Sequence, residues 1–162
     1  MRVRIARDES RPIRDLTRTI NELHQGLAIL VERVAPQLLA ERGIGVIIAA
    51  KPIGEIAGID GFTSDAQLAR VAGCAPIPVS SGRTDRYRHD RGGNRQLNHA
   101  IHMLADCEIR RDPQTALYIA RQRERGKTNR EAIRCLKRHL IRRVDNLLRD
   151  PNSVPDAIHC TV

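Results

Sequence analysis

Aromatic residues are scarce in this sequence of 162 residues: Phe62, Tyr87 and Tyr118 make up the whole 2%, and tryptophan is absent. Proteins that recognise single-stranded RNA stack the bases on aromatic side chains, so this scarcity disfavours that class. The core has to be built from leucine, isoleucine, valine and alanine. Because these residues suit the packing of helix on helix, we expect an all-α fold with one compact domain.

Three further features are missing. The four cysteines form no Cys-x-x-Cys pair, which predicts free thiols in a reducing compartment. His99 and His102 share one face of an expected helix, but no thiol or carboxylate at ligand spacing completes a zinc site, so we expect no metal in this chain. No apolar run of about 18 residues and no N-terminal hydrophobic signal region occurs, which predicts a cytoplasmic protein with no membrane partner.

Basic residues, by contrast, are abundant. The chain has 28 lysines and arginines against 19 acidic residues, a formal net charge of +9. Ten of the basic residues and only two acidic ones lie between residues 121 and 143, a local surplus of eight. Such a surplus predicts binding to double-stranded DNA, and a solvated helix face without a ligand is the alternative. Four arginines recur every four residues on the expected last helix and should form one DNA-binding stripe. They are Arg130, Arg134, Arg138 and Arg142.

Apolar periodicity divides the chain into three parts. Residues 1–41 are expected to form a basic lead without periodicity, followed by a helix that starts near Pro12 and weakens at Pro36. The apolar residues of this helix alternate at spacings of three and four, as in a coiled-coil seam. They are Ile13, Leu16, Ile20, Leu23, Leu27, Leu30 and Val34. We therefore expect residues 13–34 to form a homo-oligomer; packing of the helix on its own domain is the alternative.

Residues 42–149 are expected to form the compact helical domain, and residues 150–162 a disordered tail. Gly43 and Gly45 flank a turn before an apolar helix, as in helix-hairpin-helix modules that point backbone N–H groups at a DNA phosphate. A plain tight turn is the alternative. Pro52 should break or kink the helix that follows. Capping residues and apolar spacing predict four more helices, between residues 64 and 72, 94 and 111, 113 and 126, and 129 and 149.

The stretch between Ile77 and Asn94 has one proline, with a second just before it at Pro76, three glycines and no apolar periodicity, so we expect a loop. In it, Ser80 and Ser81 lie among several arginines, which suits a site where a hydroxyl meets a phosphodiester. Asn94 should shape the far end of the site. The arginines expected to bind phosphate are Arg83, Arg86, Arg88 and Arg91. A serine hydroxyl needs a base or a metal for activation, and the loop offers no convincing one.

An ordered series of motifs around this loop resembles the C-terminal domain of the insertion-sequence one-ten family of transposases, which includes the Piv-like DNA invertases. The resemblance covers roughly residues 42 to 149. The motifs are Gly43-Ile44-Gly45, Phe62-Thr63-Ser64, Leu68-Ala69, Ala72-Gly73-Cys74-Ala75-Pro76, Ser81-Gly82, Gly93-Asn94-Arg95-Gln96-Leu97 and Gly126-Lys127. The chain departs from the family pattern at Lys51-Pro52, where an apolar helix usually continues.

The resemblance implies a DNA transposase or site-specific recombinase in which Ser81 is the nucleophile for strand transfer. It also implies a RuvC-like N-terminal domain that supplies Asp, Glu, Asp and Asp ligands for Mg²⁺. We expect this chain to lack that domain and to be inactive alone. A guide RNA is a further candidate partner. The alternative is a non-catalytic helical module for DNA binding and dimerisation, in which Ser80 and Ser81 only hydrogen-bond to phosphate; an RNA-binding or scaffold protein is a third possibility.

Overall fold

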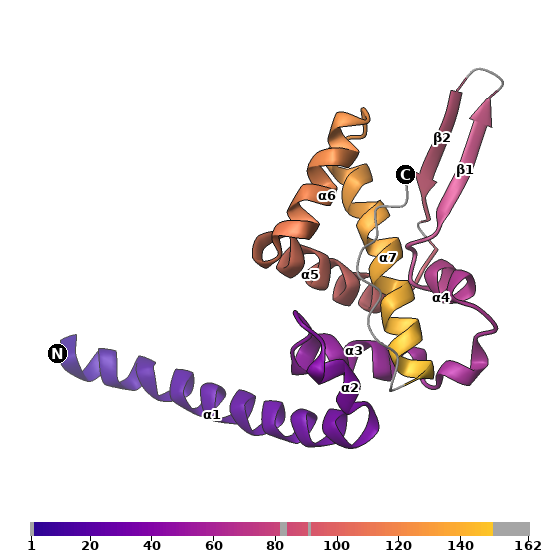
Figure 1. Cartoon of the computed structure of the whole chain (residues 1–162). Coiled ribbons are helices and arrows are strands. Elements are labelled where there is room, and N and C mark those ends of the chain that lie inside the picture. The colour runs from indigo at the N-terminus through magenta and orange to yellow at the C-terminus, as the bar shows by residue number, and fades with distance from the viewer. Residues whose placement is uncertain (1, 82–83, 91, 151–162) are drawn as a thin grey trace.

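The computed structural model of the chain describes the backbone of residues 2–81, 84–90 and 92–150 and the side chains of residues 11–79, 90 and 92–150. As predicted, the fold is all-α, with one small hairpin added (Figure 1). The elements in chain order are α1 (Arg2–Val34), α2 (Pro36–Ala40), α3 (Val46–Ile56), the 3₁₀ turn η1 (Ile59–Gly61), α4 (Asp65–Val71), β1 (Pro76–Ser81), β2 (Thr84–His89), α5 (Arg95–Arg111), α6 (Pro113–Glu124) and α7 (Asn129–Arg149). The expected tail, from residue 151 on, lies outside the described residues.

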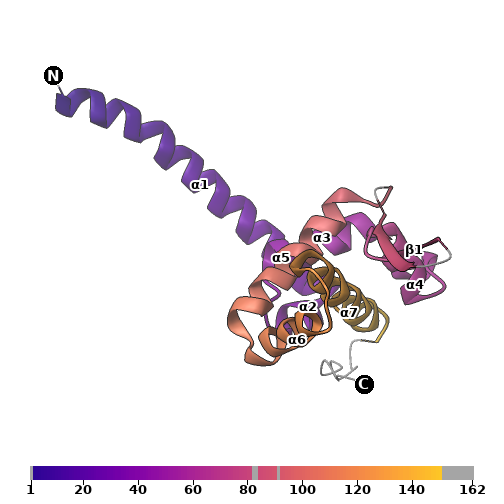
Figure 2. The same cartoon turned by 90° about the horizontal axis from the view of Figure 1, so that it is seen from above.

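Helix α1 forms an arm that extends away from the rest of the molecule, as both views show (Figures 1 and 2). Only its C-terminal end packs on the body, where Val31 is 3% exposed. The expected non-helical lead is wrong, because the helix begins at Arg2 and continues through Pro12. Arginine, alanine and glutamate fill much of the lead and are good helix formers, so helix can form there without an apolar face.

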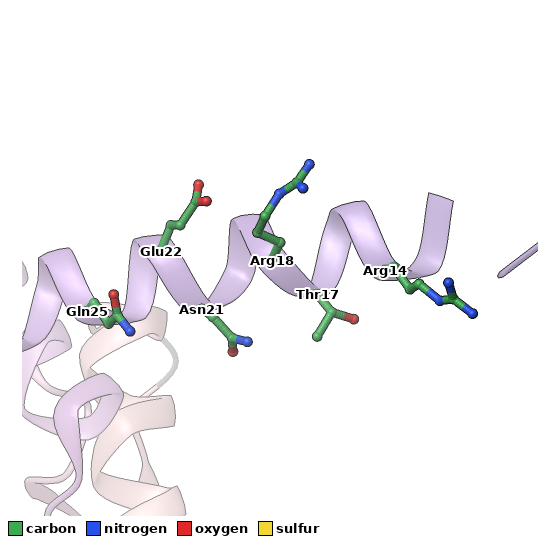
Figure 3. A pocket seen from close by; sticks show the side chains of 6 residues that line it. All are labelled: Arg14, Thr17, Arg18, Asn21, Glu22 and Gln25. Atoms are coloured by element: carbon green, nitrogen blue, oxygen red, sulfur yellow. The ribbon is translucent and has the colours of Figure 1, made fainter. Parts of the chain in front are cut away.

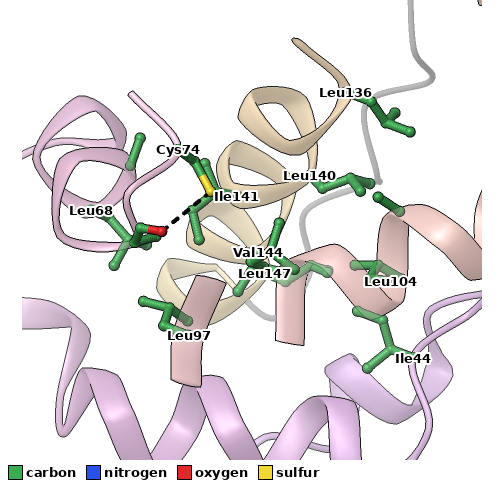
Figure 4. Packing of buried hydrophobic residues seen from close by; sticks show 14 of the residues in the cluster. Ile44, Leu68, Cys74, Leu97, Leu104, Leu136, Leu140, Ile141, Val144 and Leu147 are labelled. Carbon is green, nitrogen blue, oxygen red and sulfur yellow. Dashed lines mark hydrogen bonds between the residues drawn. The ribbon is translucent and has the colours of Figure 1, made fainter. Parts of the chain in front are cut away.

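Helices α5 and α7 cross at the centre of the body and carry most of its fully buried side chains (Figure 4). Helix α3 packs on α5, α4 packs on α7, and α6 packs on both α5 and α7. The core is aliphatic, in line with the shortage of aromatic residues. Its largest fully buried side chains include Leu68, Leu97, Ile101, Leu104, Leu136, Leu140, Ile141 and Val144.

The predicted helix starts are confirmed by their caps. Ser64 Oγ accepts a hydrogen bond from the N–H of the third residue of α4, and Asn94 Oδ1 accepts two from the first turn of α5. Asp112 caps α6 through its carboxylate. Thr128 and Glu131 form a complete capping box at the start of α7. Each cap contributes about 1 kcal/mol, which explains why the local sequence predicts these boundaries well.

Pro52 does not break α3, contrary to expectation. The helix runs on to Ile56, and the Pro52 ring is buried in the core. The proline removes one backbone donor, but burial of its apolar ring compensates for part of that loss. N-terminal to α3, the segment with Gly43 and Gly45 connects the short helix α2 to α3.

The expected loop between residues 77 and 94 is wrong over most of its length. Strands β1 and β2 pair antiparallel, from Pro76 opposite His89 to Ser81 opposite Thr84. Pro76 and Pro78 are two residues apart, so both missing N–H groups lie on the same edge of β1, and the other edge stays free to pair with β2. On β1, the apolar side chain of Val79 is 46% exposed and is not part of the core. Hydrophobic periodicity therefore carries no signal for these strands.

The two ends of the hairpin cross closely where they leave the body. A Cβ atom added to Gly93 would lie 2.4 Å from the nitrogen and 2.5 Å from the Cα of Gly73, and 2.9 Å from the carbonyl oxygen of Val71. The N–H of Asn94 donates to that same carbonyl at 2.6 Å. Gly73 has a φ of +63°, which closes α4 as predicted. This crossing fixes the base of the hairpin to α4 and α5.

Candidate nucleic-acid interface

Ser81, the expected nucleophile, is the last residue of β1 and is paired in register with Thr84, the first residue of β2. In Figure 1 the two strands project from the helical body, so the end of the hairpin with this pair lies farther from the core than the end with Pro76 and His89. Gly82, Arg83 and Arg91 lie outside the described residues. The structure therefore places Ser81 at the outer end of a strand whose inner end is held by the glycine crossing.

The other residues expected to bind phosphate near Ser81 have two different placements. Arg86 and Arg88 belong to β2, opposite Val79 and Ile77 in register. Asn94 instead stabilises the fold: it caps α5, and its Nδ2 donates to Glu55 Oε2 at 2.6 Å. The sequence did not predict the hydrogen bond to Glu55 because this carboxylate lies on a different helix, α3.

Gly43 and Gly45 lie in the turn between α2 and α3. Gly43 has a φ of +84°, and a Cβ atom there would come within 3.3 Å of Leu104 Cδ1 on α5. Gly45 is the N-terminal cap residue of α3, with an extended backbone and nothing within 4 Å of an added Cβ. Packing against α5 thus accounts for Gly43, whereas Gly45 has open space beside it.

Two arginines of the predicted stripe are engaged within the molecule. Asp65, in the first turn of α4, accepts hydrogen bonds from Arg138 Nη2 at 2.8 Å and Arg142 Nε at 2.9 Å. Burial acts to raise the pKa of Asp65, but the hydrogen bonds and charges of Arg142 and Arg138 outweigh it and hold the pKa below its usual value. Only the fold brings residue 65 to α7, so no sequence spacing could reveal this contact.

The junction between α6 and α7 carries exposed positive charge. We call it the basic elbow: Arg121, Arg123, Arg125, Lys127, Arg130 and Arg134. Arg130 is exposed, and Arg134 lies 3.8 Å from Glu131 in a loose ion pair. Lys127 Nζ donates to Gln122 Oε1 at 2.5 Å, which ties the turn to α6. The predicted arginine stripe therefore has two halves. The outer half, Arg130 and Arg134, belongs to the basic elbow, and the inner half, Arg138 and Arg142, is hydrogen-bonded to Asp65.

The seam on α1 is largely uncovered. Ile13, Leu16, Ile20 and Leu23 are each 62% to 64% exposed, and no part of the body packs on them among the described residues. Packing of residues 13–23 on the chain's own domain, the alternative drawn from sequence, is therefore wrong. A shallow hollow on this arm is formed by side chains of α1 alone, which spread outward along the helix (Figure 3). With no second element to enclose it, this hollow is not a ligand site.

The described residues do not provide a site for Mg²⁺. No group of three or more histidine, cysteine, aspartate or glutamate side chains comes together in the part of the chain that the structure describes. Mg²⁺ requires several oxygen ligands in octahedral arrangement, so no described residue is assigned to it. In the same part of the chain, no helix is long and apolar enough to cross a membrane.

Comparison with known proteins adds the family. Residues 35–120, from α2 through the hairpin to most of α6, match the model of the Transposase IS116/IS110/IS902 family. The chain belongs to this family. The transposase family inferred from the ordered motifs is thereby confirmed, and the hairpin with Ser81 lies inside the matched segment.

Curated relatives from insertion elements agree with the family model. The chain is 38% identical over 118 residues to the "Insertion element IS110 uncharacterized 43.6 kDa protein" of Streptomyces coelicolor, which is 72% of this chain and 29% of the relative. It is 35% identical over 120 residues to the "Insertion element IS900 uncharacterized 42 kDa protein" of Mycobacterium paratuberculosis, which is 73% of this chain and 30% of the relative. The chain thus matches about three-tenths of the length of these relatives.

Proposed function

We propose that this chain is the part of an insertion-element transposase that holds duplex DNA and presents Ser81 to a phosphodiester as the nucleophile. The observation that carries the proposal is the position of Ser81 at the end of β1 that projects away from the helical body. A nucleophile for duplex DNA has to reach a phosphate that cannot enter a deep pocket. The glycine crossing gives the hairpin a fixed base, which supports orientation of the attacking group.

In the proposed reaction, Ser81 Oγ attacks phosphorus and the bond from phosphorus to a sugar oxygen breaks. The serine proton passes through solvent water to that departing sugar oxygen. The product is a phosphoserine ester with one DNA strand and a free sugar hydroxyl on the other side of the break. Cationic donors stabilise the charge that develops on the non-bridging oxygens. Arg83 and Arg86 are proposed for this part because they follow Ser81 closely in the sequence. Arg88, opposite Ile77 in register, and Arg91, further along the chain, are proposed to contact neighbouring phosphates of the DNA backbone. Mg²⁺ is proposed to be held by carboxylates of a RuvC-like domain.

The basic elbow is proposed to bind the DNA backbone. Phosphate contacts supply sequence-independent affinity and steer a charged partner from a distance. Arg130 and Arg134 support this assignment because they belong to the outer half of the stripe, whereas Arg138 and Arg142 are already hydrogen-bonded to Asp65. A guide RNA carries the same backbone charge and would compete for the elbow.

The α1 arm is proposed to pair with α1 of a second copy. Its exposed apolar residues keep the three-four spacing of a seam, and the body leaves them uncovered. Exposed leucine and isoleucine side chains on one stripe cost free energy in water, and pairing removes that cost. Two copies would bring two hairpins into one assembly, which suits a reaction that joins two DNA sites.

The test of the nucleophile uses end-labelled DNA carrying an insertion-element end. The chain is fused to the N-terminal part of a family relative, to supply the carboxylate domain, and incubated with Mg²⁺. A covalent protein–DNA adduct is expected with the parent and with Ser80→Ala, the matched control, and its loss is expected with Ser81→Ala. An adduct that persists in Ser81→Ala would show that another group attacks.

The second candidate function is a non-catalytic module for DNA binding and dimerisation. The exposed basic elbow and the uncovered arm favour it, since both belong to binding and neither requires chemistry. The same experiment separates the two functions. Salt-dependent DNA binding by the fusion, with strand cleavage but no adduct in any variant, would favour the binding module and assign the attack to water.

A further inference from the structure

A pocket of about 510 Å³ lies at the base of the hairpin, beside the start of α5. We call it the foot pocket: Gly73, Asp90, Gly93, Arg95, Asn98, His99 and His102. Its backbone wall is the glycine crossing, where a side chain at Gly93 would have no room. The volume is within the range of pockets that hold small organic ligands.

Behind the foot pocket lies a buried positive charge. Lys137, on α7, is 7% exposed, and its Nζ donates to Asn98 Oδ1 at 2.6 Å. Among the described residues, no carboxylate oxygen lies within ion-pair distance of this ammonium group. Burial lowers the pKa of Lys137, as expected for a charge removed from water. A buried cation without a counter-charge is stabilised when an anion binds nearby.

The histidines of the foot pocket are suited to contact a base. Burial lowers the pKa of His102, and the positive charge of Lys137 lowers it further, so the His102 ring is neutral at pH 7. His99 Nδ1 lies 3.2 Å from Lys51 Nζ, which orients the second ring. Imidazole rings stack on bases, as other aromatic side chains do in single-strand binding proteins.

The polar groups of the pocket complete the match to a nucleotide. Arg95 offers charged donors for a phosphate. Asp90 Oδ1 accepts from the N–H of Gly92 at 2.8 Å, and a carboxylate at this position also suits the exocyclic amino group of a base. Asn98 Nδ2 donates a hydrogen bond to the carbonyl oxygen of Ala72 at 2.6 Å, so the Asn98 side chain is fixed as part of the pocket wall.

We propose that the foot pocket binds one unpaired nucleotide of a nucleic-acid strand, with its phosphate at Arg95 and its base against His99 and His102. The proposal rests on the proposed function, since it takes the strand to be the DNA presented to Ser81. Strand β1 has six residues of about 3.3 Å each, so its outer end at Ser81 lies roughly 20 Å from the pocket. The bound nucleotide is therefore several positions away from the phosphate that reacts.

The test is a titration of the 162-residue chain, labelled at histidine, with a deoxynucleoside 5′-monophosphate, followed by NMR. The ring resonances of His99 and His102 should shift, and that of His24 on α1 should not. Arg95→Gln should weaken the interaction roughly tenfold, as loss of one charged hydrogen bond implies. Arg111→Gln, at the opposite end of the same helix, is the matched control and should change nothing.

Inorganic phosphate and the free nucleoside are titrated separately. Each should bind at least about tenfold more weakly than the nucleotide, since each makes only part of the contacts. Equal shifts with inorganic phosphate would mean an adventitious ion only, and would overturn the proposal. So would equal binding of the nucleoside, or no shift at millimolar nucleotide. These outcomes are independent of adduct formation at Ser81, so failure of the pocket and failure of the nucleophile are distinguishable.

Discussion

Among the glycines in the described part of the chain, Gly93 leaves the least room for a Cβ atom, and the substitution Gly93→Ala tests this close approach. The added methyl group would meet three backbone atoms of residues 71 and 73 at 2.4 to 2.9 Å, whereas real Cβ contacts are at least 3.0 Å. Backbone atoms cannot rotate away as a side chain can, so the hairpin base has to separate from α4. Strain of this kind costs about 2 to 3 kcal/mol. The melting temperature should fall by roughly 5 to 10 °C.

Gly54→Ala is the matched control, because it makes the same chemical change in the interior of α3. Nothing lies within 4 Å of a Cβ at Gly54, and its φ is not positive. Alanine should therefore stabilise the protein, by about 0.5 to 1 kcal/mol. Urea unfolding of both variants gives the two free energies. If Gly93→Ala is as stable as the parent, the glycine crossing does not fix the hairpin.

Three further predictions concern the arm, the elbow and the inner arginines. Replacing Ile20 and Leu27 together with Asp should convert a dimer into a monomer in sedimentation measurements; an unchanged mass would show that α1 does not carry the association. Replacing Arg130 and Arg134 with Gln should flatten the log–log salt slope of duplex binding by about one to two units, and an unaltered slope would remove the elbow from the interface. The pKa of Asp65 is lowered in the folded state, so its ion pairs stabilise the fold above the unfolded pKa, and this stabilisation is lost as pH falls through the folded pKa. The stability difference between the parent and Asp65→Asn should therefore be largest near neutral pH and shrink below about pH 4; a difference that stays constant down to pH 2 would contradict the pairing.

The helices of the body were predictable because their signals are local. Ser64, Asp112 and Thr128 each start a helix through contacts within three residues, and these contacts exist before any tertiary structure forms. The apolar spacing of α5 and α7 likewise reflects the face that each helix buries. Where the fold depends on such short-range chemistry, sequence reasoning and structure agree.

The hairpin and the first turns of α1 were missed for a shared physical reason. The first turns of α1 contain few apolar residues, and Val79 of β1 is 46% exposed, so hydrophobic periodicity gives no signal in either element. The alternation of Pro76 and Pro78 was present in the sequence and was taken as a sign of a loop. The two prolines are compatible with a strand only if the opposite edge of β1 is the one that pairs, and only the register in the structure shows which edge that is.

The candidate site was predicted in part. The sequence next to Ser81, with a glycine directly after it, was enough to choose it as the candidate nucleophile. The family of the chain could be inferred from the order of the motifs. The link from Asp65 to Arg138 and Arg142 joins residues more than 70 positions apart and required the fold. His99 and His102 were noticed as a pair on one face of a helix, but without the hairpin base beside them only a metal site could be considered.

Mass spectrometry of the covalent adduct tests the nucleophile assignment most directly. The fusion is reacted with Mg²⁺ and DNA, the DNA is digested with nuclease, and the protein is cleaved into peptides. A peptide containing Ser81 should carry the mass of a nucleotide, and fragmentation should place it on that residue, with Ser80 unmodified. A nucleotide mapped to any other side chain, or cleaved DNA without a modified peptide, would contradict the assignment of Ser81 as the attacking group.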